Sequence, residues 1–174
     1  MRSDLPVIDD SSHTLRISFY GTDWRASSLS NLTAGPMDFD GVRVRCVESV
    51  VQSMNFSPND HRHASCLDLC GPVCKSMIYE AEDGSAGRKG EVHWNGRVMA
   101  IDSEERLDVI RRAIILKFSS IGSAWEALRL SQGLDLEYDT SELDEIFSVP
   151  STFFIDVLCE IRRAIGAGSF PRPS

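Results

Sequence analysis

The sequence lacks the features that mark a membrane or secreted protein. No apolar run approaches the roughly 20 residues that a membrane-spanning helix needs. The first 13 residues, MRSDLPVIDDSSH, carry acidic side chains and no apolar stretch. We therefore expect no secretory signal at this end of the sequence, and we expect a cytoplasmic protein that does not act in a membrane.

An excess of basic residues is also missing. The formal net charge is −8. Binding along a phosphate backbone needs a basic footprint, so this charge argues against an extensive nucleic-acid interface. A net charge of this size is still compatible with a local basic pocket.

The cysteines lack the CxxC spacing of zinc modules. There are five, an odd number that does not suit a framework of disulfides. Cys66, Cys70 and Cys74 recur every fourth residue, with two histidines just upstream, but the Gly-Pro pair at 71–72 interrupts any single helix through them. We expect reduced, buried thiols and no metal site.

Length and composition indicate one folded domain. The chain has 174 residues, of which 42% are hydrophobic and 25% charged, close to the averages of globular proteins. We expect a flexible N-terminus at 1–14, a domain at 15–165 and a C-terminal tail at 166–174. No internal repeat divides the domain.

Hydrophobic periodicity predicts an α+β, helix-dominated single domain with a small N-terminal β-hairpin or sheet. Asp40-Gly41 between two alternating runs is a strong hairpin signal. Residues 21–30 and 80–90 are expected to be loops, and 134–149 to be weakly helical around 141–147. Strands are expected at 15–20, 37–39, 42–44, 92–94 and 98–101, and helices at 46–56, 60–69, 72–79, 103–118, 123–131 and 151–165.

Two helices carry the pattern of a capping box at their start. Asp102 with Glu105 is expected to cap the helix at 103–118, and Ser123 with Glu126 the helix that follows it. We expect the last helix to turn Phe154 and other apolar residues at helical spacing toward the core.

The helix at 46–56 holds the most informative polar residues. Glu48 and Gln52 are four residues apart, which places both side chains on one helical face. Apolar residues surround them, as in a helix that is buried on most sides. Because Glu and Gln rarely lie buried without a partner, they either meet a structural partner or line a pocket.

This part of the chain resembles the NADAR or YbiA-like N-glycosidases. The resemblance lies in the order and spacing of four segments: 17–20 (ISFY), 29–32 (LSNL), 38–41 (DFDG) and 48–56 (ESVVQSMNF). Similar pieces continue downstream to about residue 165 at Pro72 with Lys75, Trp94, Lys117-Phe118 and Ile161-Arg162.

The resemblance implies a pocket and an activity. The pocket would be built by Asn31 in the Ser-Asn loop, by the helix with Glu48 and Gln52, and by Trp94. The activity would be hydrolysis of a C–N ribosidic bond in guanine-linked ADP-ribose or in a ribosylaminopyrimidine phosphate. The partner would be this small nucleotide-like molecule, and no cofactor is expected.

One residue departs from the family. A lysine that the family is expected to use in catalysis is Asn55 here, and an amide is not a nucleophile of that kind. Three interpretations stay open. Glu48 works with water alone, another lysine such as Lys75 substitutes, or the protein binds its ligand (with Asn55 among the contacts) without turnover or serves a structural role.

Each candidate also has a purely structural interpretation. Glu48 would pair with Arg43, Arg45 or a backbone donor, Lys75 would be a solvated helix lysine, and Trp94 would be a packing aromatic. In the catalytic interpretation, Glu48 stabilises positive charge on the ribose or activates water, Trp94 stacks on a base, and Lys75 holds a phosphate.

Overall fold

The computed structural model describes residues 12–79, 90–138 and 149–173. Most of the expected flexible N-terminus, the expected loop at 80–90 except its last residue, and the weak helix expected at 141–147 lie outside the described residues. The helices are α1 (Trp24–Leu29), α2 (Val47–Ser53), α3 (His61–Leu67), α4 (Pro72–Tyr79), α5 (Glu104–Ser120), α6 (Gly122–Leu130) and α7 (Ser151–Gly166). The strands are β1 (Thr14–Ile17), β2 (Met37–Phe39), β3 (Val42–Val44), β4 (Glu91–Trp94), β5 (Arg97–Ala100) and β6 (Asp135–Tyr138).

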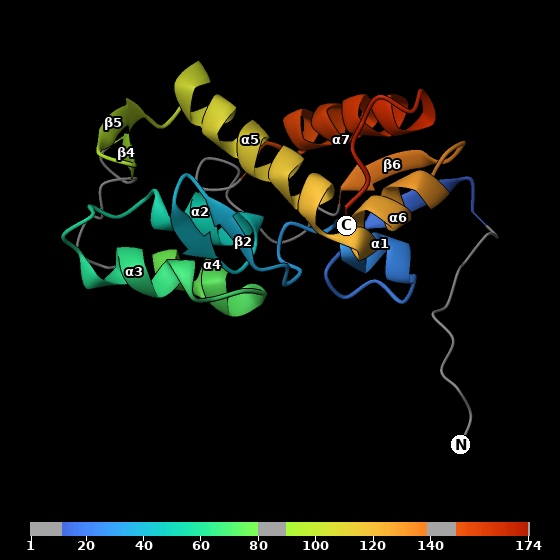
Figure 1. Cartoon of the computed structure of the whole chain (residues 1–174). Helices are drawn as coiled ribbons and strands as arrows, with labels where there is room; N and C mark the ends of the chain where they lie inside the picture. The colour runs from blue at the N-terminus through green and yellow to red at the C-terminus, as the bar shows by residue number, and fades with distance from the viewer. Residues whose placement is uncertain (1–11, 80–89, 139–148, 174) are drawn as a thin grey trace.

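The fold is the expected α+β domain, dominated by helices. Helix α5 crosses the middle of the molecule, with α2, α3, α4 and the hairpin β4–β5 toward one end and α1, α6 and β6 toward the other (Figure 1). Helix α5 packs against α2, α6 and α7, so it connects the two ends.

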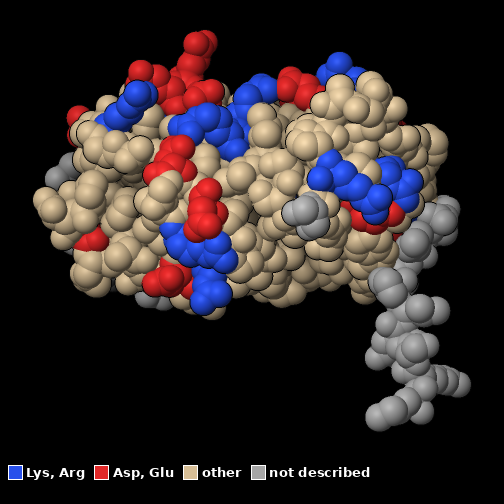
Figure 2. All heavy atoms as spheres, viewed as in Figure 1, with Lys and Arg blue, Asp and Glu red and all other residues tan. Residues whose placement is uncertain are grey.

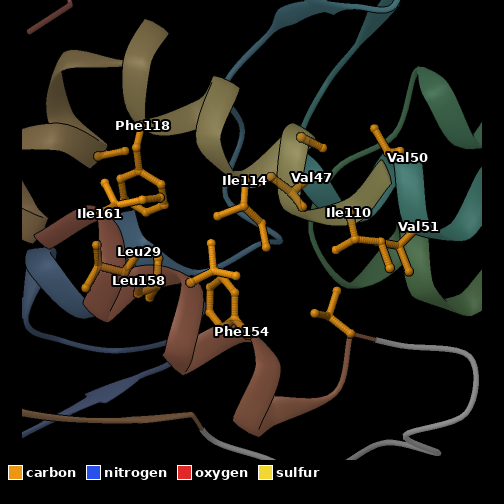
Figure 3. Packing of buried hydrophobic residues seen from close by; sticks show 14 of the residues in the cluster. Leu29, Val47, Val50, Val51, Ile110, Ile114, Phe118, Phe154, Leu158 and Ile161 are labelled. Atoms are coloured by element: carbon orange, nitrogen blue, oxygen red, sulfur yellow. The ribbon is translucent and has the colours of Figure 1, made fainter. Parts of the chain in front are cut away.

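The core forms around the apolar stripe of α5. Ile110, Ile114 and Phe118 are fully buried. Figure 3 shows them between the valines of α2 on one side and Phe154, Leu158 and Ile161 of α7 on the other. These residues belong to one hydrophobic cluster.

Three two-stranded sheets complete the fold. The hairpin β2–β3 is antiparallel, as predicted, and β4 and β5 form a second antiparallel hairpin. Their turns hold Asp40-Gly41 and Asn95-Gly96, all four with positive φ, which is the conformation of the tight turns that suit hairpins. The third sheet pairs β1 with β6 in parallel, Leu15 lying opposite Leu136.

One expectation about secondary structure is wrong, and one strand was not expected. Residues 21–30 were expected to be a loop, but α1 lies there, begun by Asp23, whose carboxylate accepts a 2.8 Å hydrogen bond from the Arg25 backbone nitrogen. A helix of six residues is too short to show a clear period. Residues 135–138 form the strand β6, which was not predicted, because its partner β1 lies far away in the sequence.

Both expected capping boxes are also wrong. Helix α5 is capped by Ser103, whose hydroxyl accepts from the Arg106 backbone nitrogen, and not by Asp102. Helix α6 begins at Gly122, one residue before Ser123. Ile121 ends α5 and also precedes α6, so the two helices follow each other with no room for a polar cap.

Candidate functional site

Helix α2 carries a carboxylate into the interior. Glu48 is 1% exposed and Gln52 is 2% exposed. Gln52 Nε2 donates a 2.7 Å hydrogen bond to Glu48 Oε1, as the four-residue spacing allows. The structural pairing of Glu48 with Arg43 is not found, because Arg43 pairs with Asp38 at the surface.

Two cations from other elements lie near this carboxylate. Burial raises the pKa of Glu48, and the charges of Lys75 on α4 and Arg106 on α5, together with the Gln52 hydrogen bond, oppose that rise. Burial likewise lowers the pKa of Arg106. A carboxylate that is desolvated and flanked by opposite charge is a feature common to functional sites.

Lys75 is not a solvated helix lysine. Its side chain is 7% exposed, so the solvated interpretation is wrong. Within the described residues its ammonium group donates no hydrogen bond to another side chain or to the backbone. Binding of a ligand by Lys75 stays a prediction.

Asn31 lies in the loop after α1, next to the start of α2, and is 1% exposed. Its carbonyl oxygen accepts a 3.1 Å hydrogen bond from the Glu48 backbone nitrogen, which ties the Ser-Asn loop to the helix. Among the described residues, neither its side-chain oxygen nor its side-chain nitrogen has a hydrogen-bond partner. Buried amides are usually paired, so an unpaired one beside Glu48 indicates a place for a ligand.

Lys117 is a residue of this region that sequence reasoning missed as a site candidate. It is 2% exposed, and its Nζ donates a 2.6 Å hydrogen bond to the Ser30 carbonyl oxygen, next to Asn31. Burial lowers the pKa of Lys117 to about 7, which the charge of Cys46 opposes. The helical spacing contained a signal, since Lys117 follows Ile114 by three residues on the apolar stripe of α5.

Asn55 lies just past the end of α2 and is fully buried. Its Nδ2 donates hydrogen bonds to the carbonyl oxygens of Val51 at 3.0 Å and Gln52 at 3.4 Å, while its Oδ1 has no hydrogen-bond partner within the described residues. The donor side of this amide therefore closes the end of the helix. A ligand contact through Oδ1 stays a prediction.

Trp94 makes its polar contact with Asp40 and not with Glu48. Its indole nitrogen donates a 2.8 Å hydrogen bond to Asp40, which also pairs with Arg112. The hydrogen bond from Arg112 holds the pKa of Asp40 below its usual value. Trp94 lines a surface hollow of about 360 Å³ with Asp40, Asn95, Arg97 and Arg112. Stacking of Trp94 on a base beside Glu48 stays a prediction.

The described residues also bear on metal and membrane binding. They contain no cluster of three or more His, Cys, Asp or Glu side chains suited to a metal ion. None of the described helices is long and apolar enough to cross a membrane. On the face in Figure 2, the coloured basic side chains lie interspersed with acidic ones.

The fold and this buried site define an α+β protein with a carboxylate, an unpaired amide and two lysines gathered around one helix. The NMR structure of the E. coli protein YbiA has a similar fold: the two chains are 18% identical, the TM-score is 0.59, and the match covers 93% of this chain and 89% of YbiA. At this identity the similarity concerns the fold alone. No protein-family model matches the chain, and no curated protein matches it.

Proposed function

We propose that this protein is an N-glycosidase that hydrolyses the C–N ribosidic bond of a nucleotide-like substrate. The substrate would be guanine-linked ADP-ribose or a ribosylaminopyrimidine phosphate, as the resemblance to the NADAR proteins implies. The observation that carries the proposal is Glu48, a buried carboxylate fixed by Gln52 and flanked by Lys75 and Arg106. The fold shared with YbiA agrees with it.

Glu48 would act on the ribose carbon. Cleavage develops positive charge there, and a carboxylate in a site of low polarity stabilises that charge more strongly than one in water. A pKa raised by burial also suits Glu48 to accept the proton of the attacking water. The water oxygen bonds to the anomeric carbon, and the C–N electron pair leaves with the base, which takes up a proton.

The orientation of the carboxylate supports this role. Oε1 accepts the hydrogen bond of Gln52, whereas Oε2 accepts none within the described residues. One oxygen thus fixes the group, and the other is available for water or for the ribose. Precise orientation of this kind lowers the entropic part of a reaction barrier.

Two further residues would bind the substrate. The unpaired amide of Asn31 has both a donor and an acceptor for a ribose hydroxyl or a base edge. The ammonium group of Lys75 would bind a phosphate oxygen as a compact point charge. The Asn31 amide lies where a ligand would supply the hydrogen bonds that the described protein groups do not, and Lys75 is a buried cation close to the carboxylate of Glu48.

A binding function without turnover is the second candidate, and Asn55 favours it. The family lysine is replaced by an amide, and this amide is engaged with the end of α2. Such a protein would keep the pocket and recognise the nucleotide, but it would lack the nucleophile that its relatives are expected to use.

Two measurements separate these functions. Calorimetric titration with ADP-ribose measures binding, and chromatography of a reaction with ADP-ribosylated guanosine or a ribosylaminopyrimidine phosphate measures release of the base. Base release supports the enzyme. Binding without release supports the second candidate. The absence of both with well-folded protein overturns the two together.

A further inference from the structure

The loop after α1 is held by three different elements through consecutive carbonyl oxygens. The donors are Lys117 Nζ on α5 for Ser30 (2.6 Å), the backbone nitrogen of Glu48 on α2 for Asn31 (3.1 Å) and the backbone nitrogen of Gly71 before α4 for Leu32 (2.8 Å). Two of these donors belong to the backbone, and the third is a side-chain ammonium group. The middle residue, Asn31, carries the buried side-chain amide that has no hydrogen-bond partner within the described residues.

Lys117 has an unusual place for a lysine. It lies in the last turn of α5, where a lysine often binds the carbonyl groups of its own helix. Its buried ammonium group instead reaches a carbonyl oxygen 87 positions earlier in the sequence, and it lies 5.6 Å from the centre of the Phe118 ring. Because a buried charge is costly and a methionine could fill similar space without one, packing alone does not account for a lysine here.

We propose that Lys117 is a positioning residue of the candidate site, whose hydrogen bond to the Ser30 carbonyl oxygen directs the adjacent Asn31 amide toward the ligand. The inference rests on the proposed function, in which that amide contacts the substrate. Ser30 also accepts a 3.1 Å hydrogen bond from the Thr33 backbone nitrogen, which closes a turn. A hydrogen bond from an ammonium group is stronger than one between neutral groups, so Lys117 is the stronger of the two donors.

The planarity of the peptide group transmits this effect from Ser30 to Asn31. The carbonyl group of Ser30 and the backbone nitrogen of Asn31 belong to one rigid peptide plane, which Lys117 holds. The next plane, between Asn31 and Leu32, is held by the backbone nitrogen of Glu48. The side chain of Asn31 therefore extends from a main chain that is fixed on both sides, and only its own rotations remain free.

A fixed main chain at Asn31 would favour binding. An amide that is already oriented has less freedom to lose when a ligand arrives, so the ligand binds more tightly. Without the Lys117 contact, the carbonyl oxygen of Ser30 keeps only the hydrogen bond from Thr33 within the described residues. Lys117 would affect the ligand only through Asn31, so its removal should matter only in a protein that has the Asn31 amide.

A double-mutant cycle tests this dependence. Calorimetric titration with ADP-ribose compares the wild type, Asn31→Ala, Lys117→Met and the double variant at about pH 6, where Lys117 is charged because burial lowers its pKa only to about 7. We expect each single variant to bind about tenfold more weakly, and the double variant to bind no more weakly than Asn31→Ala. Effects that multiply in the double variant, or wild-type affinity in Lys117→Met, overturn the proposal.

Further variants give the cycle its controls. Arg162→Met also removes a cation from backbone carbonyl oxygens, those of Ser131 and Leu134, and is expected to bind ADP-ribose like the wild type. Equal weakening of binding by this variant would overturn the proposal. Lys117→Leu repeats the cycle with a second apolar side chain, so the outcome does not depend on the folding of one variant.

NMR measurements without a ligand keep this inference distinct from the proposed function. In the unaltered chain we expect a scalar coupling across the hydrogen bond from Lys117 Nζ to the Ser30 carbonyl carbon. The side-chain amide resonances of Asn31 should move in Lys117→Met and stay in place in Arg162→Met. A missing coupling or unmoved resonances overturn the positioning role. If both expectations hold but the wild type does not bind ADP-ribose, the proposed ligand site fails while the positioning of Asn31 by Lys117 stands.

Discussion

Gln52 Nε2 lies 2.7 Å from Glu48 Oε1, one helical turn away, and both side chains are almost completely buried. This hydrogen bond lowers the pKa of Glu48 against the rise that burial causes. The hydrogen bond therefore fixes the orientation of the carboxylate and lowers its pKa.

Replacement of Gln52 by Leu is expected to shift the pH dependence of the proposed hydrolysis. Without the amide donor the pKa of Glu48 rises further, so the acidic limb of the pH–rate profile moves to higher pH. The maximal rate falls as well, because the carboxylate loses its fixed orientation. Rates measured across the acidic range check this, and Glu160→Gln at the surface is the matched control. An unchanged limb would show that Gln52 does not tune Glu48.

Replacement of Asn55 by Lys is expected to destabilise the protein. The change removes the hydrogen bonds to Val51 and Gln52 and forces an ammonium group into a fully buried position. Asn55→Ala, which removes the whole amide and with it both hydrogen bonds, should cost about 1–3 kcal/mol in the free energy of unfolding, and Asn55→Lys should cost more. Urea unfolding measures both. A lysine variant as stable as the wild type, with higher base release, would instead indicate that this position still accepts the family chemistry.

Lys117 is expected to make stability depend on pH in the alkaline range. Its pKa is about 7 in the folded protein and 10.5 in the unfolded reference, so the unfolded chain binds more protons between these values. The free energy of unfolding therefore rises with pH in this window, by up to about 1.4 kcal/mol per pH unit from this group. Lys117→Met should lose this contribution. Equal pH slopes for the two proteins in urea unfolding would contradict it.

The network of Asp40, Trp94 and Arg112 is expected to contribute little to stability. Asp40→Asn weakens the ion pair with Arg112, which is 43% exposed, and exposed pairs are worth about 0–1 kcal/mol. The lowered pKa of Asp40 means that its contribution is present above its ordinary value of 3.8 and is lost as the pH falls through the folded value. Tryptophan fluorescence against pH reports this, since the indole donates to Asp40. A fluorescence change below that pH that persists in Asp40→Asn would assign it to another group.

The elements that the sequence predicted correctly are those whose signals are local. Helices α5 and α7 show a long apolar period, and the hairpin β2–β3 carries its turn residues Asp40 and Gly41 between alternating runs. The pairing of β1 with β6 joins segments more than a hundred residues apart, and no local pattern specifies it. The cap of α5 was misplaced by one residue, which is within the usual uncertainty of helix ends.

In the candidate site, too, features set by local spacing could be predicted, and features set by the packing of distant elements could not. The shared helical face of Glu48 and Gln52, which brings them into contact, follows from their spacing and was predicted. The burial of Lys75 depends on how α4 packs against α2, and that packing cannot be inferred from α4 alone. Lys117 could have been found from its position on the apolar stripe, because a lysine among buried isoleucines needs a partner, here the Ser30 carbonyl.

The role of Glu48 is tested most directly by base release from ADP-ribosylated guanosine and from a ribosylaminopyrimidine phosphate, with wild-type protein and Glu48→Gln compared side by side. The amide has the same shape and is less costly to bury than a charge, so the variant should fold, which its melting temperature verifies. We expect wild-type turnover and a decrease of about 100-fold or more in the variant, as for loss of one electrostatic stabiliser. Equal rates for wild type and a folded Glu48→Gln, or no turnover of either substrate by the wild type, would contradict the proposed N-glycosidase activity of Glu48.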